Sequence, residues 1–234
     1  MDSADYWPGI VNRCRQDGYL YGWPLTATPG LIFYDTAAFR EANLPQPALD
    51  WTWAEMAQDV AQLTQRDGDS VSRYGLAVNG GLLEESVAAQ LLLVPVSQVA
   101  AETEWFVTLA RQGAIWTIDT TAEPDLNSLL RAGRVAMWTA TADSLPRHRN
   151  ALGDTITAVP YPQDDQFSQT SPHVVECAYI STGSQQPDAA WRWITFLTTQ
   201  AHPNDRFRIP ARPSIAQASG GFAQLPADLQ EAVR

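Results

Sequence analysis

One stretch near the start of the chain indicates the architecture most clearly. It reads GLIFYDTAAFREANLPQPALDWTWAEMAQDVAQL, residues 30–63. Its first residues form an apolar run that predicts a buried strand over 30–34. Thr36 is expected to cap a short helix that ends at Asn43, a residue type that tolerates the left-handed conformation found at helix ends. A strand followed directly by a helix is the unit from which layered α/β folds are built.

The second part of the same stretch predicts a longer helix, from Trp53 to about Gln65. Thr52 and Glu55 form a capping box, in which each side chain satisfies a backbone N–H that the first helical turn leaves unpaired. The apolar residues recur at helical spacing and therefore share one face, which we expect to be buried. They are Trp53, Met56, Val60 and Leu63.

Outward from this stretch, short apolar runs alternate with amphipathic helical patterns, which favours an α/β architecture. We expect strands at 74–79, 135–138, 155–160 and 174–180, and helices at 85–93, 97–112, 124–131 and 187–199. The last helix has an apolar face that needs a partner. We predict that this face packs on a neighbouring chain or folds back on the rest of this one.

The composition describes a folded globular protein of one or two lobes. The chain has 234 residues, 45% of them hydrophobic and 18% charged. Its net charge of -11 repels phosphate backbones and anionic lipid headgroups, so neither nucleic acid nor a membrane surface is expected as a partner. All 15 basic residues are arginine, which excludes lysine chemistry such as a Schiff base.

The two cysteines, Cys14 and Cys177, fit neither a zinc knuckle nor a CxxC redox pair. We predict two independent buried thiols, with a single long-range disulfide as the alternative. No apolar run is long enough to cross a bilayer, and the first residues show no basic segment followed by an apolar core. The chain as given is therefore expected to carry no signal peptide.

Sequence motifs of catalysis do not occur. GxSxG, HExxH, Walker and Rossmann patterns are missing, and the histidines at 148, 173 and 202 lack the spacing of metal ligands. We expect no enzyme, no cofactor and no metal site. The alternative is a carbohydrate-active enzyme, which requires two converging carboxylates. The pairs that the sequence offers are Asp50 with Glu55 and Asp164 with Asp165.

Four segments, taken in order, carry a resemblance to a known family. They are DGYLYGWP with LIFYD (17–35), AFREANLP with WTWAE (38–55), LRAGRVAM (130–137) and AAWRWITFL with PARPS (189–214). Together they resemble the family 1 extracellular solute-binding proteins of ABC importers, the maltose-binding-protein-like clamshells. The second segment is the most specific of the four.

The resemblance implies an α/β fold with one periplasmic-binding-protein-like (class II) lobe and an incomplete second lobe. Residues 30–160 would form the largely intact lobe. Residues 1–29 and 174–209 would supply hinge crossings and a remnant of the other lobe, and 210–234 the third crossing with a C-terminal extension. Because the family's usual βα units before the first hinge have no counterpart here, the chain would be a fragment, a truncated product or a degenerate member.

The resemblance also implies a function. A small-molecule ligand, first of all a sugar, would be captured in a cleft between lobes, and an ABC permease would detect closure outside the cytoplasm. An isolated lobe is expected to bind weakly or not at all, because a closed cleft removes most of the ligand's surface from water. The alternative is an interaction module that has lost its small-molecule ligand.

Seven residues are candidates for ligand contact at the implied hinges and cleft. Glu176 interrupts an apolar strand, so its carboxylate must be paired or face a polar cleft, and Arg212 is its possible partner. Trp138 would replace a stacking ring that the family places where this chain has Asp143; otherwise the cleft has lost its ligand. The candidates are Thr26, Thr28, Trp138, Asp143, Tyr161, Glu176 and Arg212.

Nine tryptophans make carbohydrate stacking a hypothesis, but core packing is the simpler explanation for most of them. We predict packing for Trp23 at a hinge, Trp51 over a helix start, and Trp53, Trp105, Trp191 and Trp193 on helical faces.

Overall fold

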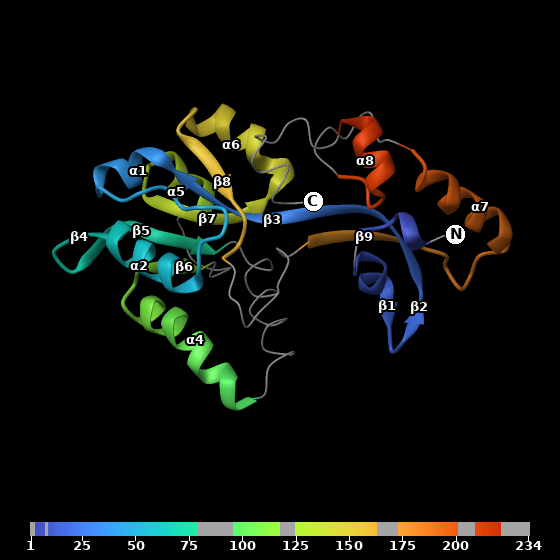
Figure 1. Cartoon of the computed structure of the whole chain (residues 1–234), viewed down its shortest axis with the longest axis horizontal. Coiled ribbons are helices and arrows are strands. Elements are labelled where there is room, and N and C mark those ends of the chain that lie inside the picture. Colours follow the sequence, from blue (N-terminus) through green and yellow to red (C-terminus); the bar gives the residue numbers. More distant parts are fainter. Residues whose placement is uncertain are drawn as a thin grey trace. The chain divides into compact units, whose positions relative to one another are not determined.

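The structure is a computed structural model of the whole chain (Figure 1). It describes residues 3–7, 9–78, 96–117, 125–162, 173–200 and 209–220. The chain divides into two compact units. Unit 1 comprises Met1–Pro29 with His173–Glu231, and unit 2 comprises Gly30–Pro172 with Ala232–Arg234. One long strand, β3 (Gly22–Asp35), contributes residues to both units.

The strands of unit 2 form a mixed sheet in the order β4-β5-β7-β3-β8, with β6 pairing to β5. Strand β3 is antiparallel to β7 and β8, whereas β5 is parallel to β6 and β7. The bounds are β4 Gln65–Asp67, β5 Ser70–Val78, β6 Ile115–Thr117, β7 Val135–Thr141 and β8 Ile156–Val159. The predicted α/β architecture is confirmed.

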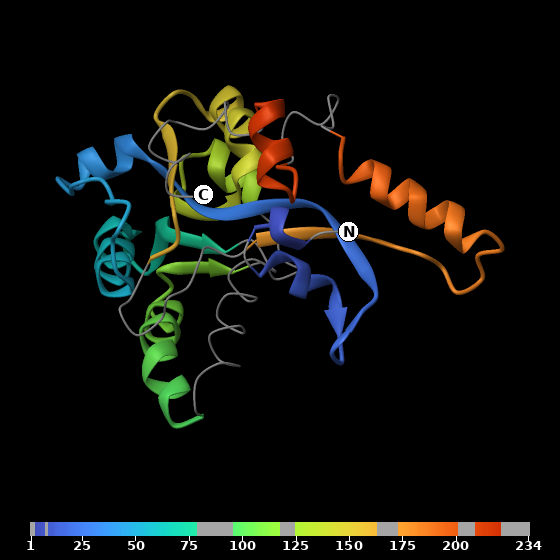
Figure 2. The same cartoon turned by 45° about the vertical axis from the view of Figure 1, so that its right-hand side comes forward.

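Helices cover both faces of this sheet, with α2 and α4 on one side and α5 and α6 on the other (Figures 1 and 2). Phe33 and Trp138 contact His148 of α6, whereas their chain neighbours Ile32 and Met137 pack with α2. The bounds are α1 Thr36–Glu41, α2 Trp53–Leu63, α4 Val96–Arg111, α5 Leu126–Arg131, η3 Ala142–Ser144 and α6 Leu145–Leu152. The helix predicted at 85–93 lies outside the described residues.

Helix α2 confirms the capping box. The backbone N–H of Glu55 donates to Thr52 Oγ1 at 3.2 Å, and the backbone N–H of Thr52 donates to Glu55 Oε2 at 2.7 Å. Met56, Val60 and Leu63 are fully buried, as the spacing predicts. Burial of these side chains contributes about 1.5–3 kcal/mol each, so the apolar face holds α2 on the sheet more strongly than the cap does.

The preceding helix, α1, begins differently from the prediction. Asp35 is its cap, since the Asp35 carboxylate accepts a hydrogen bond from the backbone N–H of Ala37 at 2.9 Å. The Thr36 hydroxyl instead donates to the backbone carbonyl of Thr155 at 3.0 Å. Thr36 therefore ties the start of α1 to the residue before β8.

The folding stability of unit 2 depends on pH through Asp59 on α2. Burial raises its pKa from 3.8 to about 6, and the negative charge of Glu55 one turn earlier adds to the shift. Because the folded state holds this proton more tightly than the unfolded state, stability falls as the pH rises from about 4 to about 6. Asp59→Asn should therefore stabilise unit 2 at pH 7.5 by about 1 kcal/mol, a value discounted because the carboxyl group is half-exposed to solvent.

Urea unfolding midpoints of wild type and Asp59→Asn between pH 4 and pH 7.5 test this, since the gap between the two proteins should close as the pH falls. Glu104→Gln, an exposed change on α4, is the control and should leave the midpoint unchanged. An equal midpoint for wild type and Asp59→Asn at every pH would contradict the prediction.

In unit 1 the first part of β3 pairs antiparallel with β9 (His173–Tyr179), with a register shift between Pro24 and Thr26. The other elements are η1 Ser3–Asp5, η2 Ile10–Cys14, β1 Arg15–Gln16, β2 Tyr19–Leu20, α7 Pro187–Leu197 and α8 Pro213–Ser219. They enclose a small core of Tyr6, Ile10, Trp23, Ala27, Ile194 and Ala211.

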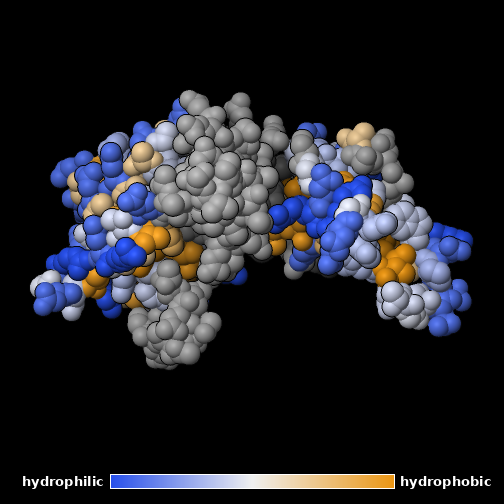
Figure 3. All heavy atoms as spheres, turned by 90° about the horizontal axis from the view of Figure 1, so that it is seen from below, coloured by the Kyte–Doolittle hydropathy of each residue, from blue (hydrophilic) through white to orange (hydrophobic). Residues whose placement is uncertain are grey.

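The tryptophan predictions separate by unit. Trp51 and Trp23 are buried, and Trp53 and Trp105 pack against the core of unit 2, so packing is confirmed for these four. It is wrong for Trp193, which is 59% exposed, because α7 turns Ile194 and Thr198 toward its own unit. Trp191 packs only in part, since its ring meets Trp23 edge to face while 42% of the residue stays exposed. On the face drawn in Figure 3, hydrophobic residues reach the surface among hydrophilic ones. Within the described ranges, no helix has the length and apolarity that crossing a membrane requires.

Candidate functional site

Two of the predicted site residues meet on neighbouring strands of unit 1. Thr26 on β3 is in register with Glu176 on β9, and the Thr26 hydroxyl donates to Glu176 Oε2 at 3.0 Å. Thr26 is buried and Glu176 is half-buried, so the carboxylate is partly withdrawn from water. Such a charge needs hydrogen-bond donors around it, and Thr26 supplies one.

A third chain segment reaches the same point. Pro210 forms an isolated antiparallel bridge with Thr26, and backbone hydrogen bonds of 2.8 and 3.0 Å join residues 209–211 to β3 on either side. Thr28, also buried, lies two residues beyond Thr26 and therefore on the same side of the strand. We call Thr26, Thr28 and Glu176 the crossing site, because three segments distant in sequence lie side by side there.

Arg212 does not pair with Glu176, which corrects the prediction. Its Nε donates to Asp5 Oδ2 at 2.8 Å, and its guanidinium lies 5.9 Å from the centre of the Tyr6 ring. The hydroxyl and backbone N–H of Ser214 donate to the same carboxylate, at 2.5 and 3.3 Å. The Ser214 hydroxyl, more than Arg212, lowers the pKa of Asp5. Arg212 thus ties the N-terminal segment to the start of α8.

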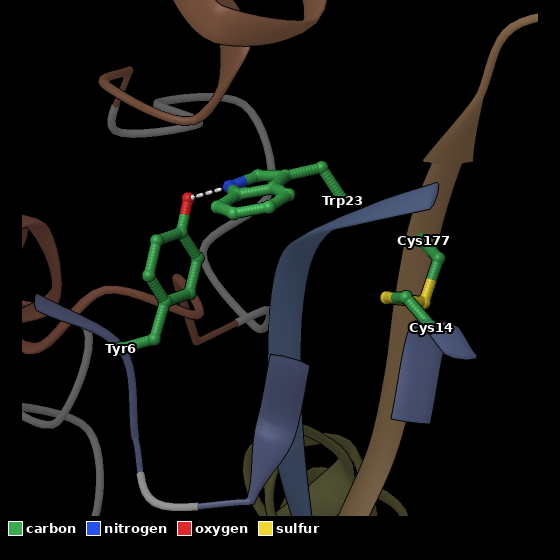
Figure 4. Close-up of a disulfide and its surroundings, with 4 residues drawn as sticks. All are labelled: Tyr6, Cys14, Trp23 and Cys177. Carbon is green, nitrogen blue, oxygen red and sulfur yellow. Dashed lines mark hydrogen bonds between the residues drawn. A yellow bond between two sulfur atoms is a disulfide. The ribbon is translucent and has the colours of Figure 1, made fainter. Parts of the chain in front are cut away.

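Cys14 and Cys177 form a disulfide (Figure 4), so the prediction of two free thiols is wrong. Their Cα atoms are 5.9 Å apart, although 163 positions separate them in sequence. Cys177 follows Glu176 directly on β9. In the same unit, the Trp23 indole N–H donates to the Tyr6 hydroxyl, and the two rings meet edge to face with centroids 5.5 Å apart. These links hold residues 3–14 against the strands that carry the crossing site.

Trp138 belongs to the interior of unit 2. It is 1% exposed, and its ring centroid lies 5.8 Å from Phe33 and 5.4 Å from His148. A ring in these contacts does not present a face to a pyranose, so the prediction of a stacking ring is corrected. Burial, with a smaller effect of Arg147, lowers the pKa of His148 to about 4. The imidazole is therefore neutral at pH 7.

Tyr161 and Asp143, both in unit 2, differ in their surroundings. Tyr161 was expected in an exposed loop, but it is buried against Trp53 at a centroid distance of 6.5 Å, and burial raises its pKa. This corrects Tyr161 as a cleft residue. Asp143 in η3 is half-buried, and its Oδ1 is enclosed without a hydrogen-bond partner among the residues that the structure describes. Asp143 therefore stays a candidate for ligand contact.

The carboxylates proposed for an enzyme have other surroundings. Glu55 is held in the capping box of α2, and the pair Asp164 and Asp165 lies outside the described residues. Over the described part of the chain, no cluster of three or more His, Cys, Asp or Glu side chains could hold a metal ion. Asp5, whose carboxylate accepts a hydrogen bond from Arg212 in unit 1, is a polar residue that no sequence pattern indicated.

Comparison with known proteins adds a family and a fold. The family model described as bacterial extracellular solute-binding protein matches residues 1–230. No curated protein matches the chain at a significant level. Structures similar to this chain include the sugar-binding protein MalE from Xanthomonas citri, which is 20% identical with a TM-score of 0.74. The alignment covers 99% of this chain and 63% of MalE.

Two further structures have the same fold. A sugar transporter from Rhizobium etli in an open conformation is 18% identical with a TM-score of 0.73, over 100% of this chain and 64% of its own. An ABC substrate-binding protein from Listeria monocytogenes, in complex with cycloalternan, is 16% identical with a TM-score of 0.72, over 100% of this chain and 63% of its own. The chain spans less than two thirds of the length of each structure.

Proposed function

The chain belongs to the bacterial extracellular solute-binding proteins, and we propose that it is the solute-binding component of an ABC importer, with a carbohydrate as its ligand. The observation that carries this proposal is the crossing site, where Thr26 donates to Glu176 beside a third chain segment. Sugar-binding and sugar-transporting proteins among the structures with this fold support the ligand class.

The chemistry of the crossing site suits a neutral polyhydroxyl ligand. An ionised carboxylate only accepts hydrogen bonds, and sugar hydroxyls are donors. The hydroxyls of Thr26 and Thr28 would orient the ligand through further hydrogen bonds. Glu176 would repel a phosphate or carboxylate ligand, and this favours a carbohydrate over an anionic solute.

We propose that residues 30–160 are the largely intact lobe and that unit 1 holds hinge crossings and the remnant of a second lobe. The ligand would be held at an interlobe cleft, as the clamshell fold implies. Asp143 is a separate proposed ligand contact within unit 2. The small core of unit 1 supports the assignment of that unit to a remnant lobe. Since an incomplete cleft leaves much of a ligand in water, this chain should bind weakly.

The disulfide supports an extracytoplasmic location, because such bonds persist in oxidising compartments. An ABC permease is the proposed partner, and no catalytic activity is proposed. Self-association through the helix around Trp193 is a separate proposal, since it depends on a different surface.

Calorimetric titration of the 234-residue chain with maltotriose and cycloalternan tests the proposal. We expect a Kd above about 100 µM for at least one of them. Glu176→Gln should weaken binding about tenfold, because it replaces charge-assisted hydrogen bonds with neutral ones. The matched control, Glu104→Gln on α4, should bind as wild type does.

Three results would count against the proposal. Micromolar affinity of this chain for either sugar would contradict the proposal that its cleft is incomplete. Equal affinity of wild type and Glu176→Gln would show that the crossing site does not contact the ligand. No binding at about 20 mM of either sugar would favour the interaction module that has lost its ligand.

A further inference from the structure

Residues 209–211, the third segment of the crossing site, are held by two sets of hydrogen bonds. Strand β3 supplies one set, on either side of Thr26. Trp7 supplies the other, since its indole N–H donates to Pro210 O and its backbone N–H donates to Ala211 O, both at 3.3 Å. The N-terminal residues therefore reach the crossing site through its third segment.

Asp5 fixes the residues that follow this segment, because it caps α8. Helix α8 begins at Pro213, and the residue before it, Arg212, has no side-chain oxygen that could accept a hydrogen bond from the first turn. Asp5 Oδ1 accepts from the backbone N–H of Ser214 at 3.3 Å instead, and Oδ2 accepts from the Ser214 hydroxyl at 2.5 Å. A carboxylate at a helix N-terminus is also favoured by the partial positive charge there. Asp5 therefore replaces the local cap that α8 lacks.

The N-terminal segment is itself anchored in the core of unit 1. Tyr6, the neighbour of Asp5, is buried, and its hydroxyl accepts a hydrogen bond from Trp23. The Arg212 guanidinium lies over the Tyr6 ring, while its Nε donates to Asp5 at 2.8 Å. The Asp5 and Arg212 side chains are only 31% and 26% exposed. An isolated surface ion pair contributes little, but this pair is partly buried and its carboxylate accepts three hydrogen bonds, so it holds two chain segments together.

Pro210 is the direct cross-strand neighbour of Thr26. The two residues face each other in an antiparallel bridge, and the hydrogen bonds lie on the residues before and after them. Side chains approach most closely in a pair of this kind and share one face of the strands. On its other side Thr26 faces Glu176, to which its hydroxyl donates. Because a threonine side chain has few χ1 rotamers, the position of Pro210 limits where the Thr26 hydroxyl points.

We propose that Asp5 is a positioning residue of the crossing site. By holding residues 209–214, it keeps Pro210 against Thr26 and so keeps the Thr26 hydroxyl directed at Glu176. The effect on a sugar ligand rests on the function proposed above, whereas the effect on the pairing of β3 with the third segment requires no ligand. The two effects are therefore tested separately.

Amide hydrogen exchange, measured by NMR on the ligand-free full chain, tests the structural effect. The backbone N–H groups of Ala27 and Ala211 join β3 to residues 209–211. Asp5→Asn should raise their exchange rates at least about tenfold, because the new side-chain amide places N–H groups where the carboxylate accepts hydrogen bonds.

Two variants control this measurement. Asp5→Glu keeps the carboxylate and should recover part of the protection. Asp188→Asn, which removes an exposed carboxylate from the first turn of α7 in the same unit, is the matched control and should exchange as wild type does.

Titration with maltotriose and cycloalternan, followed by NMR, tests the effect on the ligand. Asp5→Asn should raise the dissociation constant of the wild-type chain about threefold. In a Thr26→Val background, which has no hydroxyl to direct, Asp5→Asn should leave the dissociation constant unchanged. A residue that only stabilised the fold would weaken binding equally in both backgrounds.

Unchanged exchange of Ala27 and Ala211 in Asp5→Asn would overturn the proposal, whether or not the chain binds sugar. Equal weakening of binding in the wild-type and Thr26→Val backgrounds would also contradict it. If the wild-type chain binds neither sugar, the proposed function fails, and the exchange rates alone decide whether Asp5 positions the crossing site. Should Asp5→Asn not fold, Ser214→Ala removes one donor from an exposed residue and should speed exchange of Ala211 at least about threefold, and an unchanged rate would count against the proposal.

Discussion

Replacing Cys14 and Cys177 with serine should lower the free energy of unfolding of unit 1 by about 2–5 kcal/mol. The bond spans 163 positions, but most of these belong to unit 2. While unit 2 stays folded, only about 20 residues of the closed loop become flexible, and the chain-entropy model gives about 3 kcal/mol for a loop of that length. The small core of unit 1 has little burial with which to offset such a loss. Urea titration followed by hydrogen-exchange mass spectrometry resolves the effect, because peptides from η2 and β9 should lose protection first.

Unit 2 provides the internal control for this experiment. Both cysteines lie in unit 1, so peptides from β5 and α2 should keep their urea midpoints in the double variant. Wild type treated with reductant should behave as the variant does. Equal protection of η2 in oxidised wild type and the double variant would show that the bond adds nothing to the stability of unit 1.

Local sequence patterns predicted the elements that depend on local physics. The apolar spacing and capping box of α2 are contained within residues 52–63, and the structure reproduces both. Helix α4 begins and ends one residue earlier than the predicted 97–112. Strand β8 is one residue shorter at each end than the predicted 155–160. Helix α6 was missed because its residues, LPRHRNAL, show no apolar period.

Contacts between distant segments could not be predicted in the same way. Asp5 and Arg212 are 207 positions apart, and no periodicity connects them. The disulfide could not be predicted for the same reason, because it is the pairing of β9 with β3 that brings Cys177 to the N-terminal segment. Which distant residues meet depends on strand register, and local patterns along the chain do not show which strands pair.

The crossing site shows what a family resemblance adds to such patterns. Composition alone does not connect Thr26 with Glu176, 150 positions away. The resemblance assigned both to hinge crossings, and in the structure they share a hydrogen bond. The same resemblance failed at Trp138, because it aligned chain positions without indicating which side of β7 the ring would take.

Gly75 is the position in unit 2 where the backbone leaves least room. Strand β5 passes so close to α2 that a Cβ atom on Gly75 would lie 2.0 Å from the carbonyl oxygen of Val60 and 2.9 Å from Thr64 Oγ1. The backbone N–H of Gly75 also donates to Ala114 O at 3.1 Å, which fixes the strand from the other side. Neither backbone can move aside without breaking hydrogen bonds of the sheet or the helix.

Gly75→Ala should therefore destabilise unit 2 by at least about 3 kcal/mol, at or above the upper end of the usual cost of overpacking, because the overlap is with backbone and not with a flexible side chain. Hydrogen exchange in urea should show β5 and α2 losing protection together, while unit 1 peptides keep theirs. Gly68→Ala is the matched control. Gly68 has a positive φ of 58°, and a Cβ atom there would meet no other atom within 4 Å, so the change costs only the left-handed backbone, about 1–2 kcal/mol. If the two alanine variants lost equal stability, the close approach of β5 to α2 would not be what requires glycine at position 75.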